Sequence, residues 1–338
     1  MPPIYITEQN TKIRIRNNCI HVERETGQDP EMLYQAPIST VSQLVLSGNI
    51  GLTTSAIGTF LSRQIDVVFL DSHGNFRSRL LSEANPHTVL RRAQFHAAED
   101  KKFPVNLARR LIRAKLKHQH TILQRQNRTV QDPEIAAAVL EIAAIEKGLE
   151  GKFTLPALRG AEGNAAAVYF SGFRKLFAPE WNFRHRRQHP STDPVNGMLS
   201  YGYTLLSQAA SAAVQIVGLD PYVGFLHEDA YNRPSLALDL MEEFRPVVDG
   251  LVLWCCHSGL ITPADFERDL EGHQCLINAS ARKLLIKTFE ERMENRHIHP
   301  VTLTSLTLRQ CMLEQARQIA LCCENHTKTP EFKGMGFR

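Results

Sequence analysis

The stretch Ser82-Glu83-Ala84-Asn85-Pro86 divides this chain of 338 residues into two parts with different sequence patterns. Asn-Pro is a turn signal, because proline disfavours helical backbone in the residue before it. Before this stretch apolar residues alternate with polar ones or form short runs, whereas after it they recur at helical spacing. The sequence therefore predicts an α+β protein, with a small β-rich, sandwich-like domain over residues 1–85 and a larger all-α-helical domain over residues 86–324.

The N-terminal part carries the period-two alternation of half-buried strands. Lys12–Arg16 and Cys19–Glu23 place apolar residues at every second position, and Asn17-Asn18 between them suits the turn of a hairpin. Val41–Leu46 and Ile65–Leu70 are apolar runs rich in β-branched residues, which suit buried strands. Short strands separated by turn residues are typical of a sandwich.

Long segments without Gly or Pro dominate the rest of the chain. Residues 106–127 form one such segment, and Asp132-Pro133-Glu134 combines an N-cap Asp, a Pro at the first helical position and an acidic first turn. The last predicted helix covers Thr302–Cys323. The tail from Asn325 is polar and contains Gly and Pro, so we expect residues 325–338 to be mobile.

Composition excludes several classes of protein. Hydrophobic residues make up 43% of the chain, which is too many for a disordered protein. No apolar stretch approaches the ~20 residues of a membrane span, and the N-terminus lacks the apolar core of a signal peptide. We therefore expect a cytoplasmic protein with no membrane partner. The formal net charge of +4 is too small to identify a partner by itself, so the distribution of charge matters more.

Seven cysteines, an odd number with two adjacent pairs, are typical of a reducing compartment. Cys255, Cys256, His257, His273 and Cys275 could in principle bind zinc. Their spacing matches no C-x-x-C ribbon or finger, so buried, inert thiols are the favoured interpretation.

Basic residues gather in two places. The second cluster, Arg184-His185-Arg186-Arg187, follows Trp181 and Phe183, which could stack on an exposed base. The first block has few acidic neighbours at i,i+4, which favours phosphate contacts over a solvated helix face. It contains Arg91, Arg92, Lys101, Lys102, Arg109, Arg110, Arg113, Lys115, Lys117, Arg125 and Arg128. Arg159 and Arg245 are further candidates for contact with DNA.

Two segments contain acids that could bind a metal. Glu162 lies between Gly160 and Gly163 at a predicted helix start, where a favourable interaction with the helix dipole is the simpler explanation. His227 ends an apolar segment, and Asp239 and Glu242 share one face of the helix that follows. Two carboxylates beside a fixed His suit Mn²⁺, Mg²⁺ or Zn²⁺, but an ordinary amphipathic helix explains that segment equally well.

A third segment runs from Asp193 to Tyr203. Asp193-Pro194 is an N-cap and first-position pair, and Asn196 lies in the first turn of the helix. Capping explains Asp193. It does not explain Tyr201 and Tyr203, which flank Gly202, or the basic cluster immediately upstream.

Four ordered elements together resemble the CRISPR-associated integrase family, the larger of the two universal CRISPR adaptation proteins. Each element is weak alone, and their order makes the resemblance specific. They are Leu158-Arg159-Gly160-x-Glu162-Gly163, Asp193-Pro194-Val195-Asn196 to Ser200-Tyr201-Gly202-Tyr203, Gly218-Leu219-Asp220-Pro221 to Gly224-Phe225-Leu226-His227, and Arg233-Pro234-Ser235-Leu236 to Asp239-Leu240-x-Glu242.

The resemblance implies a site for Mg²⁺ or Mn²⁺ formed by Glu162, His227 and an acid on the following helix. By motif register this acid is Glu242, with Asp239, Asn196 and Tyr201 as catalytic or supporting residues. The family forms homodimers through the β-rich domain, and these assemble with the small companion adaptation protein into a heterohexamer. Its activity is to join the 3′-OH ends of short double-stranded foreign DNA to the CRISPR repeat by transesterification.

Three other functions stay open at this point. The same residues could form a metal-dependent DNA endonuclease that does not integrate. The chain could also be a helical DNA-binding module without catalysis, in which Glu162, His227 and Glu242 would lie far apart. A zinc-stabilised interaction protein would instead use Cys255, Cys256 and His257.

Overall fold

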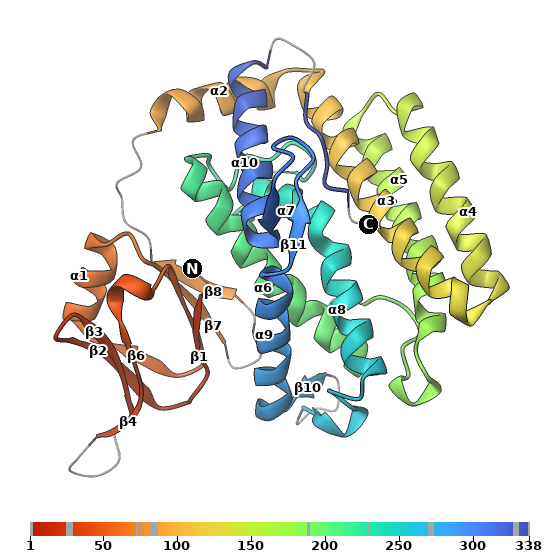
Figure 1. Cartoon of the computed structure of the whole chain (residues 1–338). Coiled ribbons are helices and arrows are strands. Elements are labelled where there is room, and N and C mark those ends of the chain that lie inside the picture. The colour runs from red at the N-terminus through yellow and green to blue at the C-terminus, as the bar shows by residue number, and fades with distance from the viewer. Residues whose placement is uncertain are drawn as a thin grey trace. The chain divides into compact units, whose positions relative to one another are not determined.

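The computed structural model describes residues 3–24, 30–71, 74, 76–80, 87–187, 190–228, 230–269, 274–326 and 331–336 (Figure 1). The chain divides into two compact units, Met1–Asn85 and Pro86–Arg338. The boundary falls in the stretch where the sequence pattern changes. None of the helices in the described ranges is long and apolar enough to cross a membrane.

The N-terminal unit contains two four-stranded sheets, with strand orders β1-β5-β7-β8 and β4-β3-β2-β6. Its elements are β1 (Ile4–Ile6), β2 (Thr11–Arg16), β3 (Cys19–Arg24), β4 (Glu31–Pro37), η1 (Ile38–Thr40), β5 (Gln43–Ser47), β6 (Ile50–Leu52), α1 (Thr54–Ser62), β7 (Asp66–Leu70) and β8 (Phe76–Leu80). The predicted hairpin is confirmed: β2 pairs with β3, and Asn17 and Asn18 both have positive φ, as a tight hairpin turn requires.

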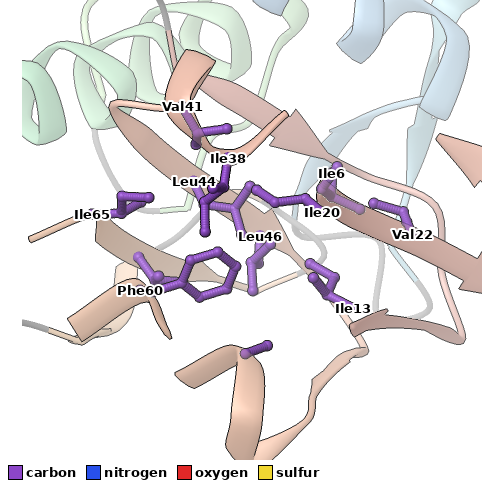
Figure 2. Packing of buried hydrophobic residues seen from close by; sticks show 12 residues of the cluster. Ile6, Ile13, Ile20, Val22, Ile38, Val41, Leu44, Leu46, Phe60 and Ile65 are labelled. Carbon is purple, nitrogen blue, oxygen red and sulfur yellow. The ribbon is translucent and has the colours of Figure 1, made fainter. Parts of the chain in front are cut away.

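Both sheets contribute to a single core in this unit. Ile13 and Ile20 come from one sheet and Leu44 and Leu46 from the other, and Phe60 of α1 packs among them (Figure 2). These side chains have almost no contact with solvent. The sandwich-like prediction is therefore confirmed. The strand β4 was not predicted, because most of its residues are exposed and its apolar residues do not alternate.

The second unit is mostly helical. Its elements are α2 (Thr88–Glu99), α3 (Phe103–Val130), α4 (Pro133–Gly148), η2 (Leu149–Gly151), α5 (Leu155–Phe173), η3 (Arg174–Leu176), η4 (Pro179–Trp181), α6 (Pro194–Val217), α7 (Ser235–Met241), η5 (Glu242–Phe244), α8 (Arg245–His257), η6 (Pro263–Asp265), β9 (Phe266–Arg268), β10 (Cys275–Ile277), α9 (Ala279–Met293), β11 (Arg296–Ile298), β12 (Ser305–Thr307) and α10 (Leu308–Glu324).

Two groups of helices make up this unit. The helices α3, α4 and α5 pack on one another, while α6 packs against α7, α8 and α10 (Figure 1). The approach of α6 to α8 is close, because a Cβ atom at Gly202 would lie 2.6 Å from Cγ1 of Val248. The long helix α3 also contacts η5 and α8, so it joins the two groups.

The prediction of a larger helical second domain is confirmed, but this domain is not entirely helical. Two short antiparallel pairs, β9 with β10 and β11 with β12, interrupt the helices. The helix predicted over Thr302–Cys323 begins only at Leu308, because Thr307 and Gln310 form a capping box there. Leu303 has a positive φ of 55°, which ends helical geometry before that point.

The expectation of a mobile tail was wrong for residues 331–336. Phe332 and Met335 are only 1% and 3% exposed. These two buried apolar side chains hold the segment against the helices. The prediction of mobility rested on the polar composition of the tail and did not take them into account. Residues 327–330, 337 and 338 lie outside the described residues.

Candidate functional site

The helix α3 carries a charged residue on its buried face. Leu107 and Leu111 are fully buried, and Lys115 continues the same stripe one turn later with only 5% exposure. The spacing of residues 107, 111 and 115 is the sequence signal that could have predicted the burial of Lys115. From the sequence, Lys115 is expected to belong to the basic block that contacts phosphate, because helical periodicity does not show which groups face a buried position.

The ammonium group of Lys115 bridges two carboxylates. It donates to Oε1 of Glu162 on α5 and to Oε2 of Glu242 in η5, the latter at 2.6 Å. Burial favours the neutral amine, but the two carboxylates outweigh it and raise the pKa of Lys115 above its usual value. Burial also acts to raise the pKa of Glu242, yet Arg245, Lys115 and His227 lower it to about 2. The structure thus holds Glu162 and Glu242 together through a cation.

Glu162 does not lie at a helix start, contrary to the sequence-based expectation. The helix α5 begins at Leu155 with Thr154 as N-cap, so Glu162 lies two turns inside it. A Cβ atom at Gly160 or Gly163 would meet nothing within 4 Å. The glycines therefore leave open space beside the carboxylate, and the helix-dipole explanation does not apply.

His227 is oriented by Asp239. Oδ1 of Asp239 lies 2.7 Å from Nδ1 of His227 and accepts from its backbone N–H, while Oδ2 accepts from the N–H groups of Phe225 and Leu226. Nε2 of His227 consequently faces Glu242, at 3.8 Å from Oε1. Asp239 is fully buried, and these four contacts occupy both of its oxygens.

The donor set of Glu162, Glu242 and Nε2 of His227 fits Mg²⁺ or Mn²⁺ in kind. A His that binds a metal through one ring nitrogen usually hydrogen-bonds a carboxylate or carbonyl through the other, and Asp239 provides such a carboxylate at Nδ1 of His227. In the described part of the chain no three His, Cys, Asp or Glu side chains come close enough to hold a metal as they stand. The Lys115 ammonium marks where positive charge is needed between the carboxylates.

Asn196 organises the basic cluster upstream of α6. Its Oδ1 accepts from Nη1 of Arg186 at 2.9 Å and from the backbone N–H of Arg187 at 2.8 Å. Its Nδ2 donates to the carbonyl of His185 and to Oδ2 of Asp193. Asn196 is fully buried, so it holds the backbone of this cluster and does not face the cavity.

Tyr203, and not the predicted Tyr201, lies at the site. The guanidinium groups of Arg186 and Arg245 lie 5.3 and 4.7 Å from the centre of its ring. Its hydroxyl donates to Oδ1 of Asp249 at 2.5 Å. Tyr201 is buried on α6 and does not line the cavity. Residues 201 and 203 project in different directions from a helix, which the sequence segment alone did not resolve.

The candidate metal ligands Glu162, His227 and Glu242 line a cavity of about 600 Å³. Five Lys or Arg side chains and two Glu side chains contribute to it, so positive charge is in excess even with both carboxylates ionised. The lining consists of Lys115, Gln119, Glu162, Ala166, Ala167, Phe170, Ser171, Arg174, Arg184, His185, Arg186, Tyr203, His227, Glu242 and Arg245. A cavity of this charge suits a phosphodiester.

Much of the first basic block has a structural role. Arg113 forms ion pairs with Glu146 and Glu150, and Arg109 donates to the carbonyls of Leu149 and Lys152. The lack of acidic neighbours at i,i+4 does not leave Arg113 available for phosphate, because its acidic partners come from α4 and η2.

The remaining candidates for DNA contact form two groups. The side chains of one group bind other parts of the chain, and those of the other are exposed. Arg91 and Arg110 donate to the carbonyls of Gly218 and Phe332. Arg159 donates to the carbonyl of Leu226 and pairs with Glu228. The candidates that the structure leaves exposed are Arg92, Lys101, Lys102, Lys117, Arg125, Arg128, Arg184 and Arg187.

The cysteines do not form a zinc site in the described residues. Cys255 and Cys256 are buried on α8, and burial raises the pKa of the Cys255 thiol to about 11. Nε2 of His257 lies 2.7 Å from the carbonyl oxygen of Leu176. His273 lies outside the described residues. Protonated, buried thiols are poor zinc ligands, which favours the inert interpretation.

Comparison with known proteins gives a consistent result. The family model described as CRISPR associated protein Cas1 matches residues 4–291. CRISPR-associated endonuclease Cas1 3 of Thermus thermophilus is 34% identical over 315 residues, which cover 93% of this chain and 91% of the relative. The CRISPR-associated exonuclease Cas4/endonuclease Cas1 fusion of Geobacter sulfurreducens is 34% identical over 325 residues and 93% of this chain. The chain spans only 57% of that fusion.

Solved structures share the fold over the whole chain. A casposase bound to integration product has a TM-score of 0.87 at 24% identity, covering 100% of this chain and 95% of its own. A chain in a Cas6-RT-Cas1–Cas2 complex has a TM-score of 0.85 at 21% identity, covering 98% of this chain and 36% of its own. At these identities the likeness concerns the fold.

Proposed function

The chain belongs to the CRISPR-associated Cas1 family, and we propose that it is a divalent-metal-dependent enzyme that integrates DNA. Its substrates would be the 3′-OH ends of short double-stranded fragments and the repeat of a CRISPR array. The observation that carries the proposal is the convergence of Glu162, Glu242 and His227 at one wall of a cationic cavity. These residues come from α5, η5 and the segment between α6 and α7, and packing brings them together.

The proposed reaction is a transesterification. The attacking 3′-OH loses its proton and forms a new P–O bond. The P–O bond to the 3′-oxygen of the repeat strand breaks, and that oxygen takes up a proton, so the number of phosphodiesters is unchanged. Mg²⁺ or Mn²⁺, when held by Glu162, Glu242 and His227, would polarise the phosphoryl oxygen and stabilise the developing charge. Asp239 keeps Nδ1 of His227 engaged, so that Nε2 is directed toward the site.

The arginines around Tyr203 suit the role of holding the DNA strand. Arg186 and Arg245 flank one aromatic ring, and the first is held by Asn196 while the second is held by Glu242. Fixed guanidinium groups bind phosphate oxygens with little loss of conformational freedom. We infer that these two residues position the phosphodiester and do not read its bases.

We propose that the chain works as a homodimer assembled with the companion protein Cas2 into a heterohexamer. A structural neighbour is a Cas6-RT-Cas1–Cas2 complex, which supports the choice of partner. The edge strand β4 supports pairing through the N-terminal unit, because Met32 and Tyr34 on it are 45% and 43% exposed. Since its substrate would be a chromosomal array, the enzyme would act in the cytoplasm.

A second candidate is DNA hydrolysis without joining. The Thermus thermophilus relative is named an endonuclease. The same site could accept water in place of a 3′-OH. One assay separates these reactions: a 3′-OH duplex and a repeat-containing plasmid are incubated with Mn²⁺ and Cas2. Joined product supports integration, whereas nicked plasmid alone supports hydrolysis.

The assignment of the site is tested in the same assay. Glu162→Ala, His227→Ala and Glu242→Ala are each expected to abolish joining while leaving DNA binding largely intact. Glu180→Ala is the matched control, because Glu180 is an exposed acid in η4 outside the cavity. Wild-type rates of joining in all three site variants would refute the assignment.

A further inference from the structure

The segment Glu331–Gly336, here called the C-terminal strap, packs beside α3 (Figure 1). The carbonyl of Phe332 accepts from Nη1 of Arg110 on α3. The backbone N–H of Lys333 donates to Oε1 of Gln318 at 3.0 Å, and its carbonyl accepts from Gln315 and Gln318 of α10. Phe332 and Met335 are buried. The strap is therefore held by backbone and side-chain contacts to two helices.

The strap also reaches the element that carries Glu242. The backbone N–H of Met335 donates to Oε2 of Glu243 at 2.9 Å, and Nε2 of Gln315 donates to both oxygens of the same carboxylate. Glu243 is fully buried, so it depends on these donors. Glu242 lines the cavity while the adjacent Glu243 is bound by the strap and α10. Fixing Glu243 thereby fixes the short turn η5.

On α3 the contact lies one residue from Lys115. A Cβ atom at Gly334 would lie 2.4 Å from Cβ of Ala114 and 3.4 Å from Oε2 of Glu243. Gly334 thus lies between the neighbour of Lys115 and the neighbour of Glu242. Its φ is not in the left-handed region, so a larger residue here is opposed by contact alone.

We propose that the C-terminal strap is a positioning element for the metal and phosphate site, which sets α3 and η5 so that Lys115 and Glu242 meet. The role in catalysis rests on the proposed function, whereas the role in positioning does not. The strap lies beyond residues 4–291, which the family model matches. The proposed support for the site therefore comes from a segment outside the residues that the family model matches.

The test compares Gly334→Val with Gly336→Val in the full-length protein. A Cβ atom at Gly336 would meet nothing within 4 Å, so this variant is the matched control. Hydrogen exchange of peptides covering residues 110–118 and 240–246 is measured without DNA or metal. Faster exchange in both peptides of Gly334→Val alone is expected. Equal exchange in the two variants would overturn the proposal, even if the wild-type enzyme proved unable to join DNA.

A second readout concerns the site itself. The Mn²⁺ concentration for half-maximal joining is expected to rise about 10-fold in Gly334→Val, as for loss of a residue that supports metal ligands. It should not change in Gly336→Val. A loss of activity with an unchanged Mn²⁺ requirement would count against positioning. Absence of joining by the wild type would refute the proposed function and leave the exchange result to decide on the strap.

A rescue experiment covers the case in which Gly334→Val does not fold. Gly334→Ala places a methyl group against Ala114, and the added change Ala114→Gly removes the methyl group it meets. The double variant should recover the exchange pattern and Mn²⁺ requirement that Gly334→Ala loses. No recovery would show that the contact between residues 114 and 334 does not set the site.

Discussion

Lys115 and Glu242 form a buried ion pair, with 2.6 Å between Nζ and Oε2 and with 7% and 4% of the two side chains exposed. They lie 127 residues apart in sequence. A buried charge is tolerated only when it is paired, so removal of either partner leaves an unfavourable charge in the core. Lys115 and a divalent cation would therefore both neutralise the carboxylates of Glu162 and Glu242.

Lys115→Met tests this relationship through stability. In EDTA the variant is expected to lose about 3 kcal/mol of unfolding free energy, because Glu242 and Glu162 lose their shared cation. Added Mn²⁺ should restore more stability to the variant than to the wild type. Chemical denaturation with and without Mn²⁺ measures both effects. Lys117→Met, which changes an exposed residue of the same helix, is the control. An unchanged stability of Lys115→Met in EDTA would contradict the prediction.

Asp239→Asn tests the orientation of His227. Asparagine keeps the shape but replaces one oxygen by an NH₂ group, which cannot accept from the N–H donors of Phe225, Leu226 or His227. Joining is expected to fall about 10- to 100-fold, with a higher Mn²⁺ requirement. Activity titrated against Mn²⁺ measures both quantities. If Asp239→Asn matched the wild type, Asp239 would have no role in orienting the imidazole.

Asp249 predicts a pH dependence of stability. Burial raises the pKa of its carboxyl to about 6 against the hydrogen bond from Tyr203 and the charges of Lys115 and Arg186, which act to lower it. A raised pKa means that the native state binds more protons than the unfolded state between about pH 4 and 6. The contribution of this group is therefore favourable below pH 4 and is lost as pH rises through 6, by on the order of 3 kcal/mol.

Asp249→Asn removes this titration and still offers an oxygen to the Tyr203 hydroxyl. The stability of the variant relative to the wild type is expected to increase from pH 4 to pH 6 and to level off above. Denaturation curves at several pH values provide the comparison. A constant difference across this range would show that Asp249 does not titrate there.

Substitution of Arg184 and of Arg113 is expected to affect DNA binding differently. Arg184 is exposed at the cavity, whereas Arg113 is engaged by Glu146 and Glu150. Loss of one phosphate contact lowers the salt slope of binding by about 0.9. We expect this change in Arg184→Ala and none in Arg113→Ala. Binding to a duplex measured at several salt concentrations gives the slopes, and equal slopes for the two variants would argue against a phosphate contact by Arg184.

The sequence by itself determined many of the elements and the boundary between the two units. Alternation over Lys12–Arg16 and the turn at Asn17-Asn18 predicted a hairpin, because strand and helix periods are local properties of the chain. The change of pattern before Pro86 located the division into two units for the same reason. The order of four motifs indicated the family, although each of them alone had a simpler structural explanation.

Only the tertiary structure decided which residues meet. Lys115 contacts Glu162 and Glu242 across 47 and 127 residues of sequence. Periodicity shows that position 115 is buried, but only the packing of α3 with α5 and η5 shows which groups face it. The same holds for Arg113, whose acids lie on other elements, and for the C-terminal strap. Local pattern sets which face of an element is buried, whereas the charges that share that buried space depend on contacts distant in sequence.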